Sequence, residues 1–361
     1  MNKFYSDIRK NFGFGMMRLP MIGEDVDLAQ TEKMVDAFME AGFNYFDTAH
    51  PYIKGKSETA VRDCLVKRYP RDAYILTNKL SSFCFEKEEE IRPLFASQLE
   101  ACGVEYFDFY LHHAMSAERH KKHTDTKAYE IVKEFKAQGK VRHIGLSFHD
   151  SAEVLDQILN DQPEIEVVQL QINYADWEDP NVQGRACYDV CVKHGKPVIV
   201  MEPVKGGSLV NLPQQALDLM GGRPASYAIR FAADHDQIMM VLSGMSNMEQ
   251  MEDNILTMKD FQHLSQKEME IIDRVRTIFQ GLYKIPCTGC RYCVEGCPAG
   301  IPIPDVFTVF NNKKREKEGA DEAYAAFENN ASACLGCGQC EAECPQHLHI
   351  RELLEAVAKA F

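Results

Sequence analysis

Short, β-rich apolar runs alternate with helical patterns eight times between residues 12 and 243. Such runs are typical of parallel strands buried on both faces, and parallel strands joined by helices leave few possible architectures. The alternation predicts a (β/α)8 barrel, with an open doubly wound sheet as the alternative; the first run is not followed by the G-x-G-x-x-G that would favour that sheet. The predicted strands are Phe12–Met16, Phe43–Asp47, Ala73–Lys79, Phe107–His112, Val141–Leu146, Glu166–Gln171, Pro197–Glu202 and Gln237–Ser243.

Amphipathic segments fill the intervals between these runs and continue beyond the last one. Their apolar residues recur at helical spacing, and several of the segments end at a glycine. The predicted helices are Leu28–Ala41, Ser57–Lys67 with Ser57 as its N-cap, Glu88–Cys102, Thr126–Gln138, Ala152–Asn160, Gln183–His194, Pro224–Ala233, Met248–Met258, Gln266–Gln280, Asp321–Asn329 and Ile350–Phe361.

The C-terminal part of the chain contains two cysteine runs with one spacing, C-x2-C-x2-C-x3-C-P. Three thiolates at this pitch can hold one corner of an iron–sulfur cube. The fourth Cys precedes a Pro that turns the chain away, so it reaches the other cube. Paired zinc knuckles are the alternative, but they use two C-x2-C arms with a longer spacer, often with His. We expect one 4Fe-4S cluster on Cys287, Cys290, Cys293 and Cys344, and a second on Cys334, Cys337, Cys340 and Cys297.

Composition narrows the class of protein further. The formal net charge of -14 at pH 7 argues against a basic face for a nucleic-acid partner. No apolar run reaches the roughly 18 residues of a membrane span, and the N-terminal residues lack the apolar core of a signal peptide. We therefore expect a cytoplasmic protein with no membrane association, whose cysteines outside the two runs are reduced.

Polar residues follow three neighbouring predicted strands, where barrel enzymes carry their active sites. The second strand leads into Asp47-Thr-Ala-His-Pro-Tyr52, the third ends at Lys79, and the fourth ends in the pair His112-His113. Because the ends of parallel strands meet at one face of a barrel, an Asp, a Tyr, a Lys and a His are expected to converge there. Each has an ordinary structural explanation alone, but four at successive strand ends indicate a site.

Such a set of side chains can move a proton to or from an oxygen atom. A Tyr hydroxyl, with a pKa of about 10, is a weak acid, and a nearby ammonium lowers that pKa. Lys79 would supply the ammonium, Asp47 would hold it in an ion pair, and a neutral His would orient a carbonyl oxygen or relay a proton. The chemistry that fits is protonation of a ketone or aldehyde oxygen, coupled to hydride arrival at carbon.

The sequence resembles the aldo-keto reductases over roughly residues 10 to 260, in the branch that carries a C-terminal extension similar to bacterial two-cluster ferredoxins. The resemblance implies a catalytic tetrad of Asp47, Tyr52, Lys79 and one His. The family spacing selects His113, which also shares the strand parity of its apolar neighbours; whether His112 packs or acts stays open. The matching stretches are Gly13-Phe-Gly-Met-Met-Arg-Leu-Pro20, Phe46-Asp-Thr-Ala49, Gly55-Lys-Ser-Glu58, Thr77-Asn-Lys79, Asp108-Phe-Tyr-Leu-His-His113 and Gly145-Leu-Ser147.

The resemblance also implies a nicotinamide cofactor, NAD(H) or NADP(H). Ser147 and Gln169 match residues that hold the nicotinamide amide, and Met201 stands where an aromatic residue usually stacks on nicotinamide. Gly244 and Gln250 replace the Lys and Arg that surround the 2'-phosphate in typical NADP-binding members, which puts a preference for NADPH in doubt. The candidates in the phosphate and adenine segment are Ser243, Gly244, Asn247, Gln250, Asp253 and Asn254.

We therefore expect an aldo-keto reductase-like barrel at residues 1–280 and a ferredoxin-like domain at 281–361. The expected function is interconversion of a small carbonyl compound and its alcohol, adjacent to one-electron transfer with a redox protein as partner. Nothing in the sequence indicates a flavin, although a flavin could split the two electrons of a hydride. Two other classes stay open: an electron-transfer protein whose barrel is a docking platform, and a redox sensor whose clusters only stabilise the C-terminus.

Overall fold

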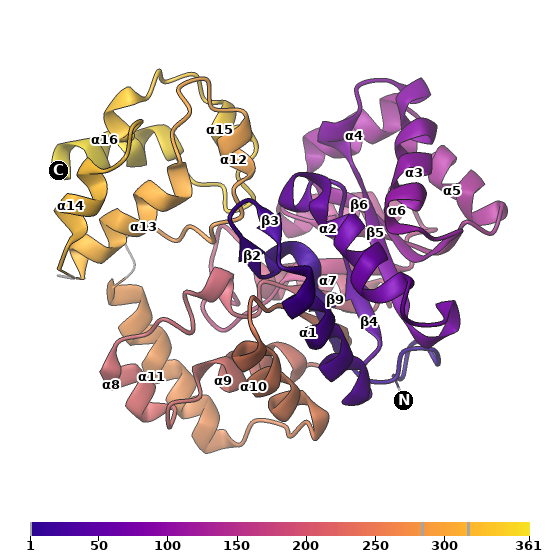
Figure 1. Cartoon of the computed structure of the whole chain (residues 1–361), viewed down its shortest axis with the longest axis horizontal. Helices are drawn as coiled ribbons and strands as arrows, with labels where there is room; N and C mark the ends of the chain where they lie inside the picture. The colour runs from indigo at the N-terminus through magenta and orange to yellow at the C-terminus, as the bar shows by residue number, and fades with distance from the viewer. Residues whose placement is uncertain (1, 283–284, 316–317) are drawn as a thin grey trace. The chain divides into compact units, whose positions relative to one another are not determined.

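The computed structural model describes residues 2–282, 285–315 and 318–361. Within these residues, eight parallel strands close into a barrel in the order β1-β10-β9-β8-β7-β6-β5-β4 (Figure 1). The predicted (β/α)8 barrel is confirmed, since each predicted run overlaps one strand. The barrel strands are β1 Phe12–Gly15, β4 Tyr45–Asp47, β5 Ile75–Ser81, β6 Phe107–Met115, β7 Val141–Phe148, β8 Val167–Gln171, β9 Val198–Met201 and β10 Ile238–Gly244.

Side chains fill the interior of the barrel, as the alternating in-and-out geometry of its strands requires. Gly145 shows how tight the packing is: a Cβ atom there would lie 2.5 Å from Cγ2 of Val167 and 2.6 Å from Cδ2 of Leu111. The barrel is therefore a packed core, and chemistry is confined to the mouth formed by the C-terminal strand ends. The buried group includes Ile8, Tyr45, Ile75, Phe109, Leu111, Val167, Ile199, Met239, Met240 and Leu242.

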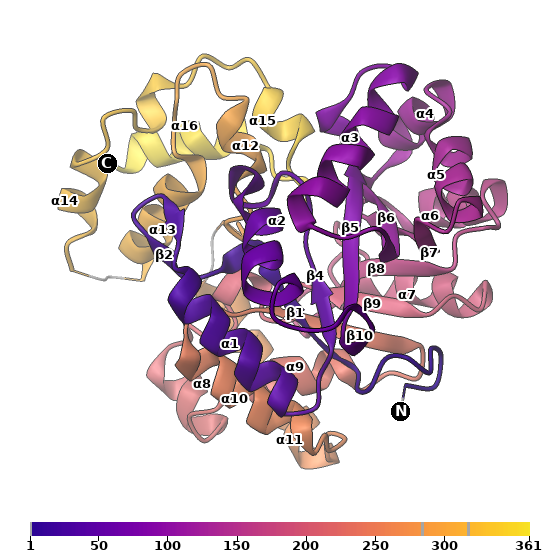
Figure 2. The ribbon, with the colours of Figure 1, turned by 45° about the vertical axis from the view of Figure 1, so that its right-hand side comes forward.

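Helices that follow the strands cover the outside of the barrel, and Figure 2 shows α1 and α2 outside β4 and β5. Helix α1 begins where Asp27 accepts a hydrogen bond from the backbone N–H of Gln30 at 3.0 Å, and it buries Met34 and Phe38. Helix α4 was not predicted, because its sequence is almost wholly polar. The helices are α1 Leu28–Glu40, α2 Lys56–Val61, α3 Glu88–Cys102, α4 Ala117–Asp125, α5 Ala128–Ala137, α6 Ala152–Asp161, α7 Gly184–Lys193, α9 Pro224–Ala233 and α10 Met248–Lys259.

Packing divides the chain into two compact units. The first consists of residues up to Pro203 together with Ala225–Leu264, and the second consists of Val204–Pro224 together with Ser265–Phe361. The segment Val204–Pro224, which contains α8 (Gln214–Leu219), thus packs with the C-terminal residues although β9 and α9 flank it in the sequence. Helix α11 (Gln266–Leu282) also packs with the second unit, so the division at residue 280 stays a prediction about domains.

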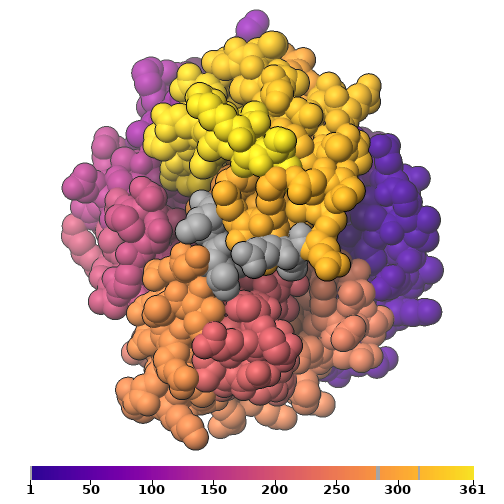
Figure 3. All heavy atoms as spheres, turned by 90° about the vertical axis from the view of Figure 1, so that its left-hand side faces the viewer, coloured from indigo at the N-terminus to yellow at the C-terminus, as the bar shows by residue number. Residues whose placement is uncertain are grey.

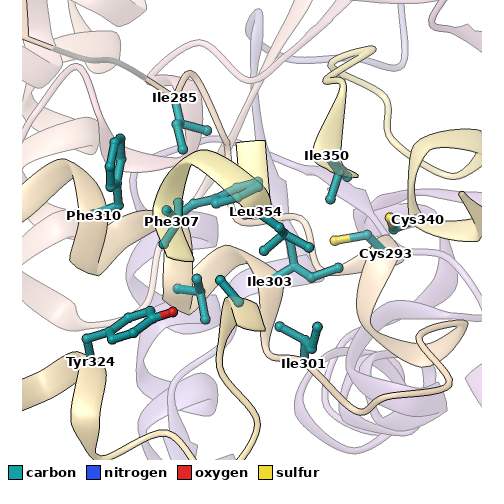
Figure 4. Packing of buried hydrophobic residues seen from close by; sticks show 13 residues of the cluster. Ile285, Cys293, Ile301, Ile303, Phe307, Phe310, Tyr324, Cys340, Ile350 and Leu354 are labelled. Carbon is teal, nitrogen blue, oxygen red and sulfur yellow. The ribbon is translucent and has the colours of Figure 1, made fainter. Parts of the chain in front are cut away.

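The second unit has a small apolar core between short helices, and two cysteines belong to it. Figure 4 shows Cys293 and Cys340 at one end of this packed group, close to Ile350. In Figure 3 the last helix, in the brightest yellow, forms part of the exposed surface of the unit. None of the helices in the described residues is long and apolar enough to span a membrane. The further helices of this unit are α12 Tyr292–Glu295, α13 Ile303–Lys314, α14 Ala320–Ala325, α15 Gln339–Ala342 and α16 Ile350–Ala360.

Candidate active site and cluster cavities

The four side chains of the predicted tetrad lie together at the barrel mouth, and all are buried. Asp47 ends β4, Lys79 and His113 lie near the ends of β5 and β6, and Tyr52 opens a 3-10 turn after β4. Lys79 Nζ donates to Asp47 Oδ1 at 2.6 Å and lies 4.7 Å from the centroid of the Tyr52 ring. The ring centroids of Tyr52 and His113 are 5.9 Å apart. The fold thus brings the four side chains to one place.

Burial controls the electrostatics of the Lys79–Asp47 pair. Burial lowers the pKa of Lys79 and raises the pKa of Asp47, while the charge of each partner opposes the other's shift. The side chain of Gln169, on β8, also favours the charged form of Asp47. A second acceptor, the carbonyl oxygen of Thr48, lies 2.9 Å from Lys79 Nζ. The amino group is therefore held beside the Tyr52 ring by two oxygens whose positions the barrel determines.

His113 is oriented by a neighbouring strand and kept neutral. Its Nδ1 lies 2.5 Å from Oγ of Ser81, at the end of β5. Burial lowers the pKa of His113 well below its usual range, and the nearby charge of Lys79 lowers it further. A neutral imidazole with one nitrogen engaged by a hydroxyl presents its other nitrogen, Nε2, in a defined direction.

His112 lies in the wall between the barrel and its helices. Its Nδ1 is 3.0 Å from Nδ1 of His123 on α4, and its ring centroid is 4.5 Å from that of Tyr129 on α5. Burial lowers the pKa of His112 to about 3 and that of His123 well below its usual range. His112 is therefore a packed and hydrogen-bonded neutral ring, which answers the question that the sequence left open.

The turn that carries Tyr52 has an unusual backbone. Ile53 and Lys54 both have φ of 53°, and Gly55 has φ of 82°. Only glycine adopts this left-handed region without cost, and a β-branched residue there is a genuine outlier. Two strained residues therefore follow directly after the candidate proton donor.

Ser57, two residues after this turn, is held by hydrogen bonds to other segments of the barrel unit. Ser57 Oγ donates to the carbonyl oxygen of Met16 at 2.9 Å and lies 2.7 Å from Oγ1 of Thr48. Its predicted role as the N-cap of a helix is wrong, since Gly55 occupies that position. A buried serine and a capping serine look alike in sequence, because only tertiary packing shows which groups they meet.

A buried polar network, which the sequence analysis did not assign, fixes the backbone of Lys79 from the outer side. Asn78 Oδ1 accepts from the backbone N–H of Lys79 at 2.8 Å, and Gln98 Nε2 donates to the carbonyl oxygen of Lys79 at 2.9 Å. Glu58 accepts from Asn78 Nδ2 at 2.8 Å and pairs with His50 Nδ1 at 2.8 Å. The signal was present, since Glu58 and Asn78 both occur in the stretches that carry the family resemblance.

The predicted nicotinamide-binding residues lie on three successive strands, β7, β8 and β9. Ser147, in β7, accepts a hydrogen bond through Oγ from the backbone N–H of Ala114 at 2.7 Å. Gln169 lies in β8 and is directed at Asp47, and Met201 is the last residue of β9. Ser147 and Gln169 therefore contact the tetrad or its direct neighbour in the chain, and Met201 lies on the next strand.

The predicted phosphate and adenine segment folds back on β10 through its own hydrogen bonds. Asn254 Nδ2 donates to Ser243 Oγ at 2.8 Å, and Asn247 caps α10 by accepting from the backbone N–H of Gln250 at 2.9 Å. Asp253 lies within the same helix, and its carbonyl oxygen accepts a hydrogen bond from the Thr257 hydroxyl at 3.0 Å. The segment therefore presents the N-terminus of a twelve-residue helix at the end of β10.

Arg18 was missed by the sequence analysis and lies beside Gly244. A Cβ atom on Gly244 would lie 3.3 Å from both Cβ and Cδ of Arg18, whose guanidinium reaches Glu202 at 3.4 Å. The carbonyl oxygen of Arg18 accepts from the Ser246 hydroxyl at 2.8 Å. A basic side chain therefore stands where the sequence suggested that one was lacking. No local pattern marked it, because its nearness to Gly244 depends on the pairing of β1 with β10.

The eight cysteines of the two runs line two cavities in the second unit. Each takes three cysteines from one run and the fourth from the other, in an otherwise largely apolar wall. Four cysteine sulfurs grouped in this way are the ligand set that a 4Fe-4S cube requires. The first cavity is lined by Cys287, Cys290, Cys293 and Cys344, and the second by Cys297, Cys334, Cys337 and Cys340.

Known proteins with similar sequences are reductases. An aldo-keto reductase of Mycolicibacterium vanbaalenii is 28% identical over 267 residues, which cover 71% of this chain and 88% of that protein. The 9,11-endoperoxide prostaglandin H2 reductase of Trypanosoma cruzi is 27% identical over 72% of this chain and 88% of its own length. The NADH-specific methylglyoxal reductase of Escherichia coli is 28% identical over 48% of this chain and 57% of its own length.

Solved structures share the barrel. An aldo/keto reductase from Klebsiella pneumoniae in complex with NADP and acetate matches with a TM-score of 0.60 and 20% identity, over 74% of this chain and 91% of that one. The holo form of an aldo-keto reductase from Bacillus halodurans matches with a TM-score of 0.59 and 22% identity, over 73% and 91% of the two chains. At these identities the likeness concerns the fold.

Family models match both parts of the sequence. The model of the Aldo/keto reductase family covers residues 11–277, and that of a 4Fe-4S dicluster domain covers residues 286–348. The first match spans most of the chain and includes the four side chains at the barrel mouth. The chain therefore belongs to the aldo/keto reductase family of oxidoreductases that act on carbonyl groups, and it carries a 4Fe-4S dicluster domain at its C-terminus.

Proposed function

We propose that the barrel interconverts a small carbonyl compound and its alcohol with NAD(H) or NADP(H). The observation that carries the proposal is the fully buried Lys79, paired with Asp47 at 2.6 Å and held 4.7 Å from the Tyr52 ring. A desolvated ion pair costs stability unless its geometry is well satisfied, and perturbed titratable groups mark functional sites. Next to a neutral His113, this arrangement suits general acid–base chemistry.

In this proposal Tyr52 gives its proton to the carbonyl oxygen and takes it back in the reverse direction. The Lys79 ammonium favours negative charge on the Tyr52 oxygen as the proton leaves, and Asp47 keeps that ammonium charged. His113, held by Ser81, orients the carbonyl oxygen with its second ring nitrogen. The packed barrel beneath the mouth excludes water from the reacting groups.

We assign the dinucleotide to the rim formed by β7 to β10, where bound nicotinamide would supply or accept the hydride. The N-terminus of α10 supports a phosphate there, because its first backbone N–H groups attract anions. Proteins similar to this chain include an NADH-specific reductase and a structure that holds NADP, so either dinucleotide is a reasonable ligand. The proposed contacts are Ser147, Gln169, Met201, Ser243, Gly244, Asn247, Gln250, Asp253 and Asn254.

We assign the two sets of four cysteines to two 4Fe-4S clusters, which would supply one-electron chemistry when bound. A hydride moves two electrons at once, and no residue at the barrel mouth divides such a pair. We therefore propose a one-electron redox protein as the partner of the clusters. The check is anaerobic reduction with NADH alone: fast bleaching of the iron–sulfur absorbance without added flavin would contradict this separation, and slow bleaching followed by ready reduction with dithionite would support it.

The variant that tests the barrel reaction is Tyr52→Phe. Loss of general acid catalysis lowers carbonyl reduction by roughly 10²- to 10⁴-fold, and the variant should still bind dinucleotide. Tyr69→Phe is the matched control, since that hydroxyl bonds Asp36 on an outer helix. Titration with NADH and NADPH completes the test. Full activity in Tyr52→Phe would overturn the assignment, and failure of wild-type protein to bind either dinucleotide would favour a barrel without reductase activity.

A further inference from the structure

The two cysteine runs place matching residues around their cavities, so the cavities can be compared position by position. Ile301 and Leu348 follow the fourth Cys of their runs by the same number of residues, and so do Phe307 and Leu354. Each of these four apolar side chains lines one of the two cavities. Most of the wall is therefore equivalent, and the positions that differ are informative.

The largest difference is a charge. Arg351 lines the second cavity, and the matching residue of the first run is Pro304, which lines the first cavity. The Arg351 guanidinium lies over Gly338, next to Cys337: a Cβ atom on Gly338 would be 3.6 Å from Cζ and 3.7 Å from Nε of Arg351. One cavity thus has a cation in its wall and the other has an uncharged ring at the same place.

An acidic residue holds this cation without lining the cavity itself. Glu341 Oε2 accepts a hydrogen bond from Arg351 Nε at 2.9 Å and lies 2.8 Å from Arg351 Nη2. Its other oxygen accepts from the backbone N–H of Arg351 at 2.8 Å, at the start of α16. The pair is therefore fixed, and its positive end is the part that reaches the cavity wall.

The second cavity, which has the cation in its wall, is also the one whose residues are more exposed to water. Leu335, which follows the first Cys of its run, is 72% exposed, and Cys337 is exposed as well. Thr288 has the matching position in the first run and is buried. The backbone of Gly206, from the segment Val204–Pro224 of the same unit, lies against it, since a Cβ atom on Gly206 would be 2.1 Å from the carbonyl oxygen of Thr288.

We propose that Arg351 sets the reduction potential of the cluster in the second cavity above that of the cluster in the first, so that an electron entering the unit comes to rest at the exposed Cys337 edge. Reduction adds one electron from a one-electron donor to a cluster that already has four thiolate ligands. A nearby cation and access to water both favour the more negative, reduced state, and net charge and exposure are known to set such potentials. This inference depends on the proposed ligand sets.

The test is an anaerobic redox titration of the full chain with dithionite, followed by EPR. Wild-type protein should show two one-electron steps. In Arg351→Gln the reduction of the higher-potential cluster should become about tenfold less favourable, which is about 59 mV for a one-electron couple, with the lower step unchanged. Arg351→Lys should restore most of the difference because it keeps the charge. Glu341→Gln should raise the same step, since it leaves Arg351 unbalanced while keeping an oxygen acceptor.

Arg291→Gln is the matched control. Arg291 is also about half exposed, is paired with Asp305 at 2.9 Å and follows the ligand Cys290, but it does not line the first cavity. It should change either step less than threefold. Equal shifts in Arg291→Gln and Arg351→Gln, or no shift in Arg351→Gln, would overturn the role of Arg351 while leaving the clusters in place. Absence of two cluster signals in wild-type protein would instead contradict the ligand sets, and this inference with them.

Discussion

The barrel mouth and the two cysteine-lined cavities position their functional side chains in different ways. At the mouth, Asp47, Lys79 and His113 project from strands whose positions are set by the whole barrel. Their placement depends on packing and hydrogen bonds. In the second unit the cysteines are part of the core: Cys293 and Cys340 are buried within the apolar group that holds the short helices together.

This difference predicts which substitutions change activity and which change stability. A large barrel keeps its fold when one side chain at the mouth changes, so substitutions there should act mainly on chemistry. The second unit has cysteines of the proposed ligand sets within its apolar core, so we expect it to depend on cluster binding, because the free energy of metal binding is then part of the free energy of folding. Four substitutions test this contrast, and they follow in order of decreasing effect.

Cys293→Ala should disrupt the second unit while leaving the barrel folded. The substitution removes a proposed cluster ligand of the first cavity and a member of the core, and binding of a structural metal contributes on the order of 10 kcal/mol in total. Iron content should fall by at least half, and residues 285–361 should become sensitive to protease, with the barrel's thermal transition unchanged. Cys64→Ala, a buried cysteine in the barrel unit, is the control. A fully protected second unit in Cys293→Ala would break the contrast.

Lys79→Met is an exception among substitutions at the barrel mouth, because it should lower stability as well as activity. It leaves Asp47 buried without its cation, which typically costs about 3–5 kcal/mol of unfolding free energy. Combining it with Asp47→Asn should recover most of that stability, because no unpaired charge is then buried. The double variant should recover none of the activity, because the Lys79 ammonium is still absent. Thermal or urea unfolding of the three proteins is the measurement. Additive losses in the double variant would contradict the proposed coupling.

Acidification should destabilise the barrel through its buried histidines. The folded-state pKa of His112 is about 3 against an ordinary value of 6.5, so the unfolded chain binds protons that the folded chain does not. Stability is therefore fully present above pH 6.5 and is lost as the pH falls towards 3. By pH 5 one such ring costs about 2 kcal/mol. His112→Gln should reduce the loss between pH 7 and pH 5.

The choice of dinucleotide should be the smallest effect. Gly244 and Gln250 offer no cation to a 2'-phosphate, and Arg18 is engaged by Glu202, so NADH should bind at least as tightly as NADPH. Glu202→Gln releases the guanidinium and should shift the ratio of dissociation constants towards NADPH by about threefold to tenfold, at most about 1.4 kcal/mol. Glu178→Gln, which breaks another ion pair of the barrel, is the control. An unchanged ratio would rule out Arg18 as a phosphate contact.

The sequence predicted those features that depend on local patterns. The ends of α3 and α9 were predicted correctly, because Gly103 and Pro224 mark them and both residues have clear conformational preferences. Strand periodicity placed His113 and His112 on opposite sides of β6, which the structure bears out in their different neighbours. The grouping of cysteines around two cavities also follows from spacing alone.

What could not be predicted depends on residues that are far apart in the sequence. Ser57 was assigned to a helix cap because its partners, Met16 and Thr48, come from other segments. Arg18 gained its meaning only when the barrel closed and β1 came to lie beside β10. The packing of Gly206 against Thr288 joins a segment after β9 to the first cysteine run, and no local pattern announces such a contact.

The left-handed turn after Tyr52 makes stability and activity compete at one place in the chain. Non-glycine residues in sparsely populated backbone regions cost on the order of 1–3 kcal/mol each, and glycine at Ile53 and Lys54 would remove that cost. The same change would make the turn more flexible and let the hydroxyl of Tyr52, the proposed proton donor, sample more positions, and catalysis falls steeply when a reacting group is displaced by about an ångström. A search for thermostable variants would therefore favour glycine at these two positions, and the variants that it selected would be slower catalysts.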